Sequence, residues 1–202
     1  MGDSTIAGTT MTYSHLNDFP AHIRDRAARI RLACFDVDGT LTDGRLSIDQ
    51  DGNESKAFHV LDGLGLKLIQ RKGITVAFVT ARASAAAERR AAELGVESHT
   101  GVSDKLACVQ GIADRLGVSL DEVAFMGDDL ADLRVMLQVG LSVAPSQAHA
   151  WTRERAHWRT SARGGEGAAR ELCDLLLAAQ GHAEALLDDI AHVTGIRVEG
   201  QA

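Results

Sequence analysis

The chain has 202 residues, of which 45% are hydrophobic and 24% charged, an ordinary composition for a soluble protein of one domain. Its formal net charge of −7 argues against nucleic acid or an anionic membrane as a partner. No apolar run is long enough to span a bilayer, and the N-terminal residues do not resemble a signal peptide, so we expect a cytoplasmic protein. The cysteines Cys34, Cys108 and Cys173 lack metal-ligand spacing and are expected to be reduced thiols.

Strand and helix patterns alternate along the chain, which predicts an α/β fold with a Rossmann-like, doubly wound parallel sheet and helices on both faces. Residues 19–180 are expected to form this single domain, between a flexible leader at 1–18 and a tail at 181–202. Helices are predicted near 21–30, 63–72, 84–94, 104–116, 130–138 and 167–180. Strands are predicted near 31–36, 74–79, 123–127 and 140–143, with weaker ones near 97–100 and 156–160.

The segment 43–60 interrupts this alternation. Alternating residues flank the sequence Gln50-Asp51-Gly52-Asn53, and an Asp-Gly pair between two such runs is typical of a β-hairpin. The sequence therefore predicts a hairpin flap between the first strand and the next helix.

The most informative segment is Phe35-Asp36-Val37-Asp38-Gly39-Thr40, which follows the apolar run Leu32-Ala33-Cys34. Two carboxylates one residue apart at the end of a buried strand need a cation between them, or one of them must hold a proton. Both conditions suit phosphoryl transfer, in which one aspartate attacks phosphorus, a divalent metal neutralises the oxygens and a second aspartate transfers protons. The alternative is an acidic turn that caps the next element.

Three later segments fit the same chemistry. Thr80 ends a β-branched strand and offers a hydroxyl to a phosphate oxygen, with Arg82 two residues further on. Lys105 opens a helical pattern, where its ammonium can hold both a carboxylate and a phosphoryl group. Asp128 and Asp129 follow another short apolar strand, and carboxylates are the hard oxygen ligands that Mg²⁺ prefers. Taken singly, these residues also fit a strand-end hydroxyl, a solvated lysine and a helix N-cap.

In their order along the chain, the segments DVDGT, VTAR, SDK and GDDLAD resemble the haloacid dehalogenase superfamily of aspartate-nucleophile phosphatases. The resemblance covers residues from about 31 to 180. It implies that Asp36 is the nucleophile and Asp38 the general acid/base, while Thr80 and Lys105 bind the phosphoryl group.

The resemblance also implies the cofactor. Asp36, Asp128 and the backbone carbonyl of Asp38 would hold Mg²⁺. Asp129 would orient a metal-bound water, and Asp132 would support Lys105 or the loop around it.

The hairpin, the Asp62-Gly63-Leu64-Gly65 segment and the glycines at 164–167 resemble the capless branch of this superfamily, which has a hairpin flap in place of a cap domain. This resemblance implies a small anionic phosphosugar as the substrate, above all 3-deoxy-D-manno-octulosonate 8-phosphate of lipopolysaccharide precursor synthesis. Phosphates of nine-carbon acid sugars are the alternative. It also implies a homotetramer in which the hairpins associate and a neighbouring subunit's 163–170 segment or tail approaches the site.

Two positions depart from the branch, which usually carries basic residues where this chain has Leu61 and Glu166. Both positions are where a sugar acid's carboxylate would be recognised, so the departures bear on the identity of the sugar. The remaining candidates to bind that carboxylate are Arg45, Lys56, Arg163 and Arg170, although charged residues of this kind are more often simply exposed.

Two other functions compete with hydrolysis. A phosphomutase or phosphotransferase would need a lid that excludes water, and the segment between Asp38 and Thr80 has room only for a hairpin and a helix. A non-catalytic oligomerisation module would not need the nucleophile, yet both Asp36 and Asp38 are present. The sequence therefore favours a Mg²⁺-dependent phosphatase.

Overall fold

The structure, a computed structural model, describes residues 19–186. The leader predicted for 1–18 and most of the tail predicted for 181–202 lie outside these residues. Within them, the main sheet has the strand order β5-β4-β1-β6-β7-β8, and every neighbouring pair is parallel. The strands are β1 (Leu32–Phe35), β4 (Thr75–Val79), β5 (Glu97–His99), β6 (Val123–Met126), β7 (Leu141–Ala144) and β8 (Trp158–Arg159).

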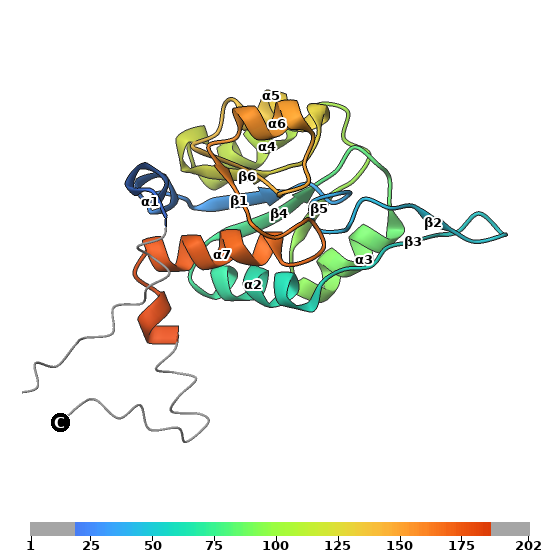
Figure 1. Cartoon of the computed structure of the whole chain (residues 1–202), viewed down its shortest axis with the longest axis horizontal. Helices are drawn as coiled ribbons and strands as arrows, with labels where there is room; N and C mark the ends of the chain where they lie inside the picture. Colours follow the sequence, from blue (N-terminus) through green and yellow to red (C-terminus); the bar gives the residue numbers. More distant parts are fainter. Residues whose placement is uncertain (1–18, 187–202) are drawn as a thin grey trace, which may run out of the picture.

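Helices cover both faces of this sheet (Figure 1), which confirms the predicted doubly wound α/β fold. One face carries α2, α3 and α7, and the other carries α4, α5 and α6. No helix in residues 19–186 is long and apolar enough to cross a membrane. The helices are α1 (Ala21–Ala27), α2 (Val60–Arg71), α3 (Ala85–Leu94), α4 (Lys105–Leu116), α5 (Leu133–Met136), α6 (Ala150–Arg155) and α7 (Ala168–Ala179), with 3₁₀ turns at Leu120–Glu122 and Leu130–Asp132.

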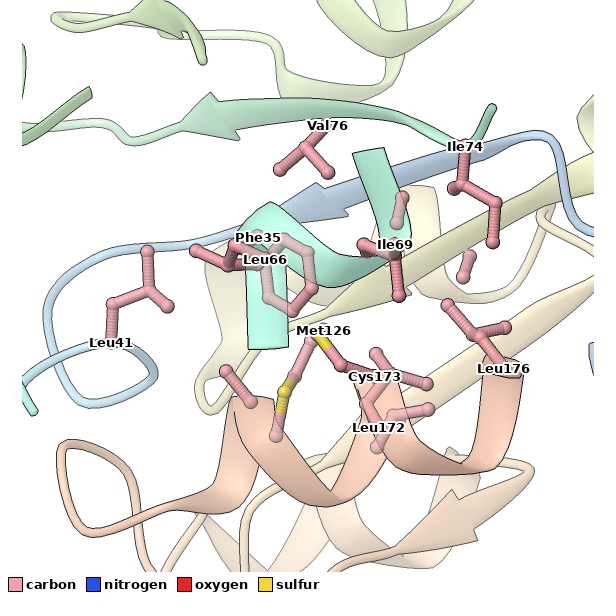
Figure 2. Close-up of a cluster of buried hydrophobic side chains, with 14 of the residues drawn as sticks. Phe35, Leu41, Leu66, Ile69, Ile74, Val76, Met126, Leu172, Cys173 and Leu176 are labelled. Carbon is pink, nitrogen blue, oxygen red and sulfur yellow. The ribbon is translucent and has the colours of Figure 1, made fainter. Parts of the chain in front are cut away.

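The central strand β1 joins two hydrophobic cores. Successive side chains of a strand point to opposite faces, so Ala33 and Phe35 pack against α2 and α7, whereas Leu32 and Cys34 pack on the α4 side. All four are fully buried, as expected for a parallel strand covered on both faces. Figure 2 shows the first core, where Phe35 of the sheet meets side chains of α2 and α7.

Small residues explain the close packing of α2 on α7. A side chain at Gly65 would collide with Arg170 and Cys173 of α7. The sequence predicted that the helix would begin at Gly63, but α2 begins at Val60. Gly63 and Gly65 therefore lie inside the helix, where they serve close packing rather than the start of the helix.

One further helix prediction was wrong, and one helix was missed. The helix predicted for 130–138 is a 3₁₀ turn followed by the four-residue α5, which ends at Met136. The helix α6 was not predicted, because a helix of six residues is too short for a 3.6-residue hydrophobic period to show clearly. Its start is stabilised locally, since the side chain of His149 accepts a hydrogen bond from the backbone N–H of Trp151.

The predicted hairpin is present but short. Its strands β2 (Ser47–Ile48) and β3 (Glu54–Ser55) are antiparallel, and it projects from the body of the fold (Figure 1). The side chain of Asp49 organises the turn, because Oδ1 accepts backbone hydrogen bonds from Asp51 at 2.9 Å and Asn53 at 2.8 Å.

The packing of α7 predicts a large effect of truncation in the first core. Leu176 is fully buried there, and removal of a buried leucine side chain typically costs about 2–5 kcal/mol. We expect Leu176→Ala to lower the free energy of unfolding in urea by an amount in this range. Leu137, which is 59% exposed, provides the matched control. Equal losses for Leu176→Ala and Leu137→Ala would contradict this description of the core.

Candidate active site

The chemistry-bearing side chains gather at the carboxyl edge of the sheet. Asp36 follows β1, Thr80 follows β4, and Asp128 comes two residues after β6. Because β1 lies between β4 and β6, these residues meet at the point where the strand order reverses, which is the usual ligand site of open α/β sheets. Lys105, the first residue of α4, reaches the same place.

The ammonium of Lys105 is the centre of the site. Its Nζ donates to Asp36 Oδ1 at 2.5 Å and to Asp132 Oδ1 at 2.6 Å, and all three side chains are buried. The other carboxylate oxygen of Asp132 accepts the backbone N–H groups of Asp128 at 3.0 Å and Asp129 at 3.2 Å. Asp132 therefore orients Lys105 and at the same time fixes the loop that carries Asp128.

Three carboxylates crowd around this lysine. Oxygens of Asp36, Asp128 and Asp132 all lie within 4.8 Å of one another. Both oxygens of Asp132 are already hydrogen-bonded, so Asp36 and Asp128 are the better ligands for a cation. Carboxylate oxygens at this separation suit a hard divalent ion such as Mg²⁺, and the residues present therefore fit the metal that the sequence predicted.

Electrostatics support the same conclusion. Burial and the charge of Asp132 raise the pKa of Asp36 above its ordinary value, although Lys105 acts in the opposite direction. Burial, Asp132 and Asp129 raise the pKa of Asp128 to about 7. Burial alone would lower the pKa of Lys105, but its carboxylate neighbours raise it overall. One ammonium does not neutralise three carboxylates, so this cluster binds either protons or a cation.

The backbone around the cluster is glycine-dependent. Gly39 has a φ of +90°, in the region that favours glycine. A side chain at Gly39 would also collide with the carboxylate of Asp128. The glycine of the DVDGT segment thus lets the loop after β1 lie directly against the loop after β6.

Asp38 lies in a second charged group, formed with the hairpin. Lys56 donates a hydrogen bond to Asp38 Oδ1, and its Nζ also lies 2.6 Å from Glu54 Oε1. Arg82 donates to Glu54 Oε2, and its Nε is 3.9 Å from Asp38 Oδ2. The structure thus brings two of the predicted substrate-binding residues, Lys56 and Arg82, next to the predicted general acid/base.

Thr80 is held by its surroundings. Its backbone N–H donates to His99 O and its carbonyl accepts from Val102 N, both at 3.0 Å. Its hydroxyl oxygen accepts the backbone N–H of Arg82 at 3.3 Å. These contacts fix the turn that carries Thr80 and Arg82 at the edge of the sheet.

The other predicted site residues have partners elsewhere in the described part of the chain. Arg45 is exposed and lies 3.7 Å from Asp43, Arg163 lies 3.8 Å from Glu166, and Arg170 donates to Asp174 at 2.7 Å. Among the described residues none of these three has a hydrogen bond or ion pair with Asp38 or Lys105, and their part in substrate binding stays a prediction. The side chain of Asp129 accepts the N–H of Leu130 at 2.7 Å, as an N-cap.

Three residues that support the site were missed from the sequence. Gln147 donates from Nε2 to Gly39 O at 2.6 Å and accepts from Gly164 N at 2.8 Å. It thereby links the loop after β1 to the glycine segment before α7. Asp62 of α2 is buried and accepts the N–H of Arg170 at 2.8 Å, so it caps the N-terminus of α7 from another helix. Glu54, described above, is the third. Asp62 was noted only as part of a segment that resembles the capless branch, and no local pattern indicates the contact that any of the three makes.

Comparison with known proteins identifies the family. A model of haloacid dehalogenase-like hydrolases matches residues 98–172. The chain is 44% identical over 161 residues to a 3-deoxy-D-manno-octulosonate 8-phosphate phosphatase of Salmonella typhi, covering 79% of this chain and 86% of that protein. The chain belongs to this phosphatase family of the haloacid dehalogenase-like hydrolases. It is therefore a phosphoric monoester hydrolase.

Solved structures agree with this assignment. A hypothetical protein of Xanthomonas campestris is 58% identical, with a TM-score of 0.87 over 90% of this chain and 100% of its own. The 3-deoxy-D-manno-octulosonate 8-phosphate phosphatase of Moraxella catarrhalis, in complex with magnesium, phosphate and KDO, is 39% identical, with a TM-score of 0.81 over 83% of this chain and 97% of its own. The resemblance stated from the four sequence segments is thereby confirmed.

The raised carboxylate pKa values predict a pH-dependent effect of Mg²⁺ on stability. The pKa values of Asp36 and Asp128 are higher in the folded protein than in the unfolded chain. Their protonation therefore stabilises the fold at low pH, and this stabilisation is lost as the pH rises through the two folded-state pKa values. We therefore expect saturating Mg²⁺ to raise the melting temperature more at pH 8.5 than at pH 5.5, where protons compete for the ligands.

Thermal unfolding with and without Mg²⁺ at the two pH values measures this effect. Asp128→Asn, which removes one of the two carboxylates that bind the metal, should abolish most of the rise in melting temperature caused by Mg²⁺. The same Mg²⁺ shift at both pH values would show that protons and metal do not compete for this cluster.

Proposed function

We propose that the protein hydrolyses 3-deoxy-D-manno-octulosonate 8-phosphate to the free sugar acid and inorganic phosphate, in the cytoplasm. The observation that carries this proposal is the ammonium of Lys105 shared by Asp36 and Asp132 beside Asp128. This arrangement pairs a nucleophile with a cation that can also hold a phosphoryl group. The identity to curated phosphatases of this substrate, over most of the chain, supports the choice of sugar.

In the first step, the free carboxylate oxygen of Asp36 attacks phosphorus, and the bond from phosphorus to the sugar oxygen breaks. Asp38, two residues after Asp36 in the sequence, gives its proton to the departing sugar oxygen. Lys105 holds Asp36 in place and faces the phosphoryl oxygens together with the hydroxyl of Thr80. Asp36 and Asp128 would hold Mg²⁺, which when bound would supply positive charge to the phosphoryl oxygens and the nucleophile.

In the second step, Asp38 takes a proton from a water molecule that attacks the phosphorus of the aspartyl phosphate. The bond between phosphorus and Asp36 then breaks, inorganic phosphate leaves, and both aspartates return to their starting states. The same carboxyl group thus acts first as an acid and then as a base, as the reversal of one proton transfer requires.

The fold favours water over a sugar hydroxyl as the final acceptor. The connection from Asp38 to Thr80 contains only the hairpin and α2, and β5 follows α3 directly, without an inserted domain. A phosphomutase would need an inserted domain or lid that closes over the site and excludes water. The described residues contain no such insertion between the strands that carry the site. The presence of both Asp36 and Asp38 likewise disfavours a non-catalytic module.

Replacement of the nucleophile gives the most direct test of this function. Asp36→Asn should reduce phosphate release to background, because an amide does not form an acyl phosphate. Asp38→Asn should lower kcat by about 10²–10⁴-fold, the usual contribution of general acid–base catalysis. Asp25→Asn, an exposed change on α1, is the control and should retain activity.

A phosphate-release assay with 3-deoxy-D-manno-octulosonate 8-phosphate, alongside neutral sugar phosphates, measures all three variants. Melting temperatures establish whether each variant is folded. Turnover by folded Asp36→Asn would exclude the proposed nucleophile, and a wild-type preference for neutral sugar phosphates would exclude the proposed substrate.

We further propose that the protein forms a homotetramer through its hairpins. The hairpin carries Leu46 and Ile48, which are 51% and 60% exposed, and the first turns of α2 carry Val60, Leu61 and Leu64, which are 78%, 49% and 45% exposed. Exposed apolar side chains on a projecting hairpin and on the helix that follows it are typical of an association surface, and an unpaired strand edge is a template for pairing with another chain. Leu61, one of the departures from the branch, belongs to this group.

Light scattering tests the assembly. The wild type should have four times the mass of one chain, and Ile48→Asp should have a lower mass, because a charge would be buried in the interface. Lys67→Asp, on the body of α2, is the control for a new acidic residue. A wild-type monomer with full phosphatase activity would contradict the tetramer and the contribution of a neighbouring subunit to the site.

A further inference from the structure

The hairpin places an acidic residue, Glu54, between the two cations at the mouth of the site. Its two carboxylate oxygens are divided between them: Oε1 lies 2.6 Å from Lys56 Nζ, and Oε2 accepts a hydrogen bond from Arg82. Both cations also face Asp38. A carboxylate of the protein thus already occupies the positively charged groups nearest to the general acid/base.

The charges of this group balance when Asp38 is ionised, as it is after it has given up its proton. Lys56 and Arg82 contribute two positive charges, and Asp38 and Glu54 contribute two negative ones. The side chain of Lys56 is only 1% exposed, and a buried ammonium without a partner would be strongly unfavourable. Glu54 therefore satisfies these cations while the site holds no substrate.

An acid-sugar phosphate brings a second anionic group, its carboxylate, toward two cations that Glu54 already contacts. If Glu54 stayed in place, the added carboxylate would face a like charge, and Lys56 and Arg82 would both already have an acidic partner. If the substrate's carboxylate replaced that of Glu54 beside Arg82, the total charge around the two cations would not change. Arg82 is the better exchange partner, because its side chain is 45% exposed and a guanidinium binds carboxylates in a two-point geometry.

We propose that Glu54 occupies the carboxylate position of the substrate in the free enzyme and is displaced from Arg82 when an acid-sugar phosphate binds. This inference rests on the proposed function and deepens it, because it makes Glu54 a residue that determines specificity for the acid end of the sugar. Lys56 stays paired with Asp38 during the exchange.

The hairpin allows such a displacement. Glu54 lies on β3, which is paired with β2 alone, through two residue pairs. The main sheet, which carries Asp36, Thr80 and Asp128, is a separate sheet. Glu54 can therefore move away from Arg82 without disturbing the strands that position the nucleophile and the metal ligands.

Glu54→Gln tests the proposal, because it removes the charge and keeps the size of the side chain. We expect KM for 3-deoxy-D-manno-octulosonate 8-phosphate to fall roughly fivefold, in line with the strength of partly exposed ion pairs, with little change in kcat. KM for arabinose 5-phosphate, which has no carboxylate, should stay the same. Asp51→Asn, at the tip of the same hairpin, removes an equal charge and controls for long-range electrostatics.

A double-mutant cycle with Arg82→Gln identifies the exchange partner. In that background Glu54→Gln should no longer lower KM for the acid sugar, because the cation that the two carboxylates share is absent. Melting temperatures of all variants confirm that the fold is intact.

Other results would overturn the inference. An equal change of KM for both substrates, an equal effect of Asp51→Asn, or an increase in KM in folded Glu54→Gln would show that Glu54 does not occupy the carboxylate position. These results leave the proposed function standing as long as the wild type prefers the acid-sugar phosphate. A wild type that hydrolyses only neutral sugar phosphates would overturn both.

Discussion

The crowding of three carboxylates, two buried and one half-buried, around one lysine is the constraint on which the rest of the structure depends. Asp36 follows β1, whereas Asp128 and Asp132 come from one segment after β6, and oxygens of all three lie within 4.8 Å of one another. Lys105 donates hydrogen bonds to Asp36 and Asp132. Such a cluster is stable only when a cation or protons complete its charge. A divalent ion does so and leaves Asp36 ionised, which is the state in which it can attack phosphorus.

The surrounding fold serves to hold these charges at fixed positions. Strand order brings the loops after β1 and β6 together, and Gly39 allows them to touch. Gln147 ties the first of these loops to the glycine segment before α7, and Asp62 caps α7 from α2. The hairpin adds a second, balanced set of charges around Asp38. The site thus combines residues at the edge of the main sheet with Glu54 and Lys56 from the separate hairpin and the segment directly after it.

Much of this could be predicted from the sequence, because the relevant signals are local. A buried strand followed by a carboxylate, a hydroxyl or a glycine is visible in a few consecutive residues, so the strands and the residues at their ends were found. The supporting contacts were not found, since Gln147 lies 108 residues from Gly39, as does Asp62 from Arg170. The role of Glu54 was missed for a different reason: a glutamate in a hairpin is ordinarily an exposed residue, and only the structure shows which cations it meets.

The stereochemistry of phosphoryl transfer tests the central claim most directly. A substrate whose phosphate is made chiral with oxygen isotopes and sulfur would be hydrolysed, and the configuration of the released thiophosphate determined. Attack by Asp36 followed by attack of water comprises two in-line displacements, and the account therefore predicts overall retention of configuration at phosphorus. Inversion would mean that water attacks the substrate directly, and it would contradict the role of Asp36 as the nucleophile.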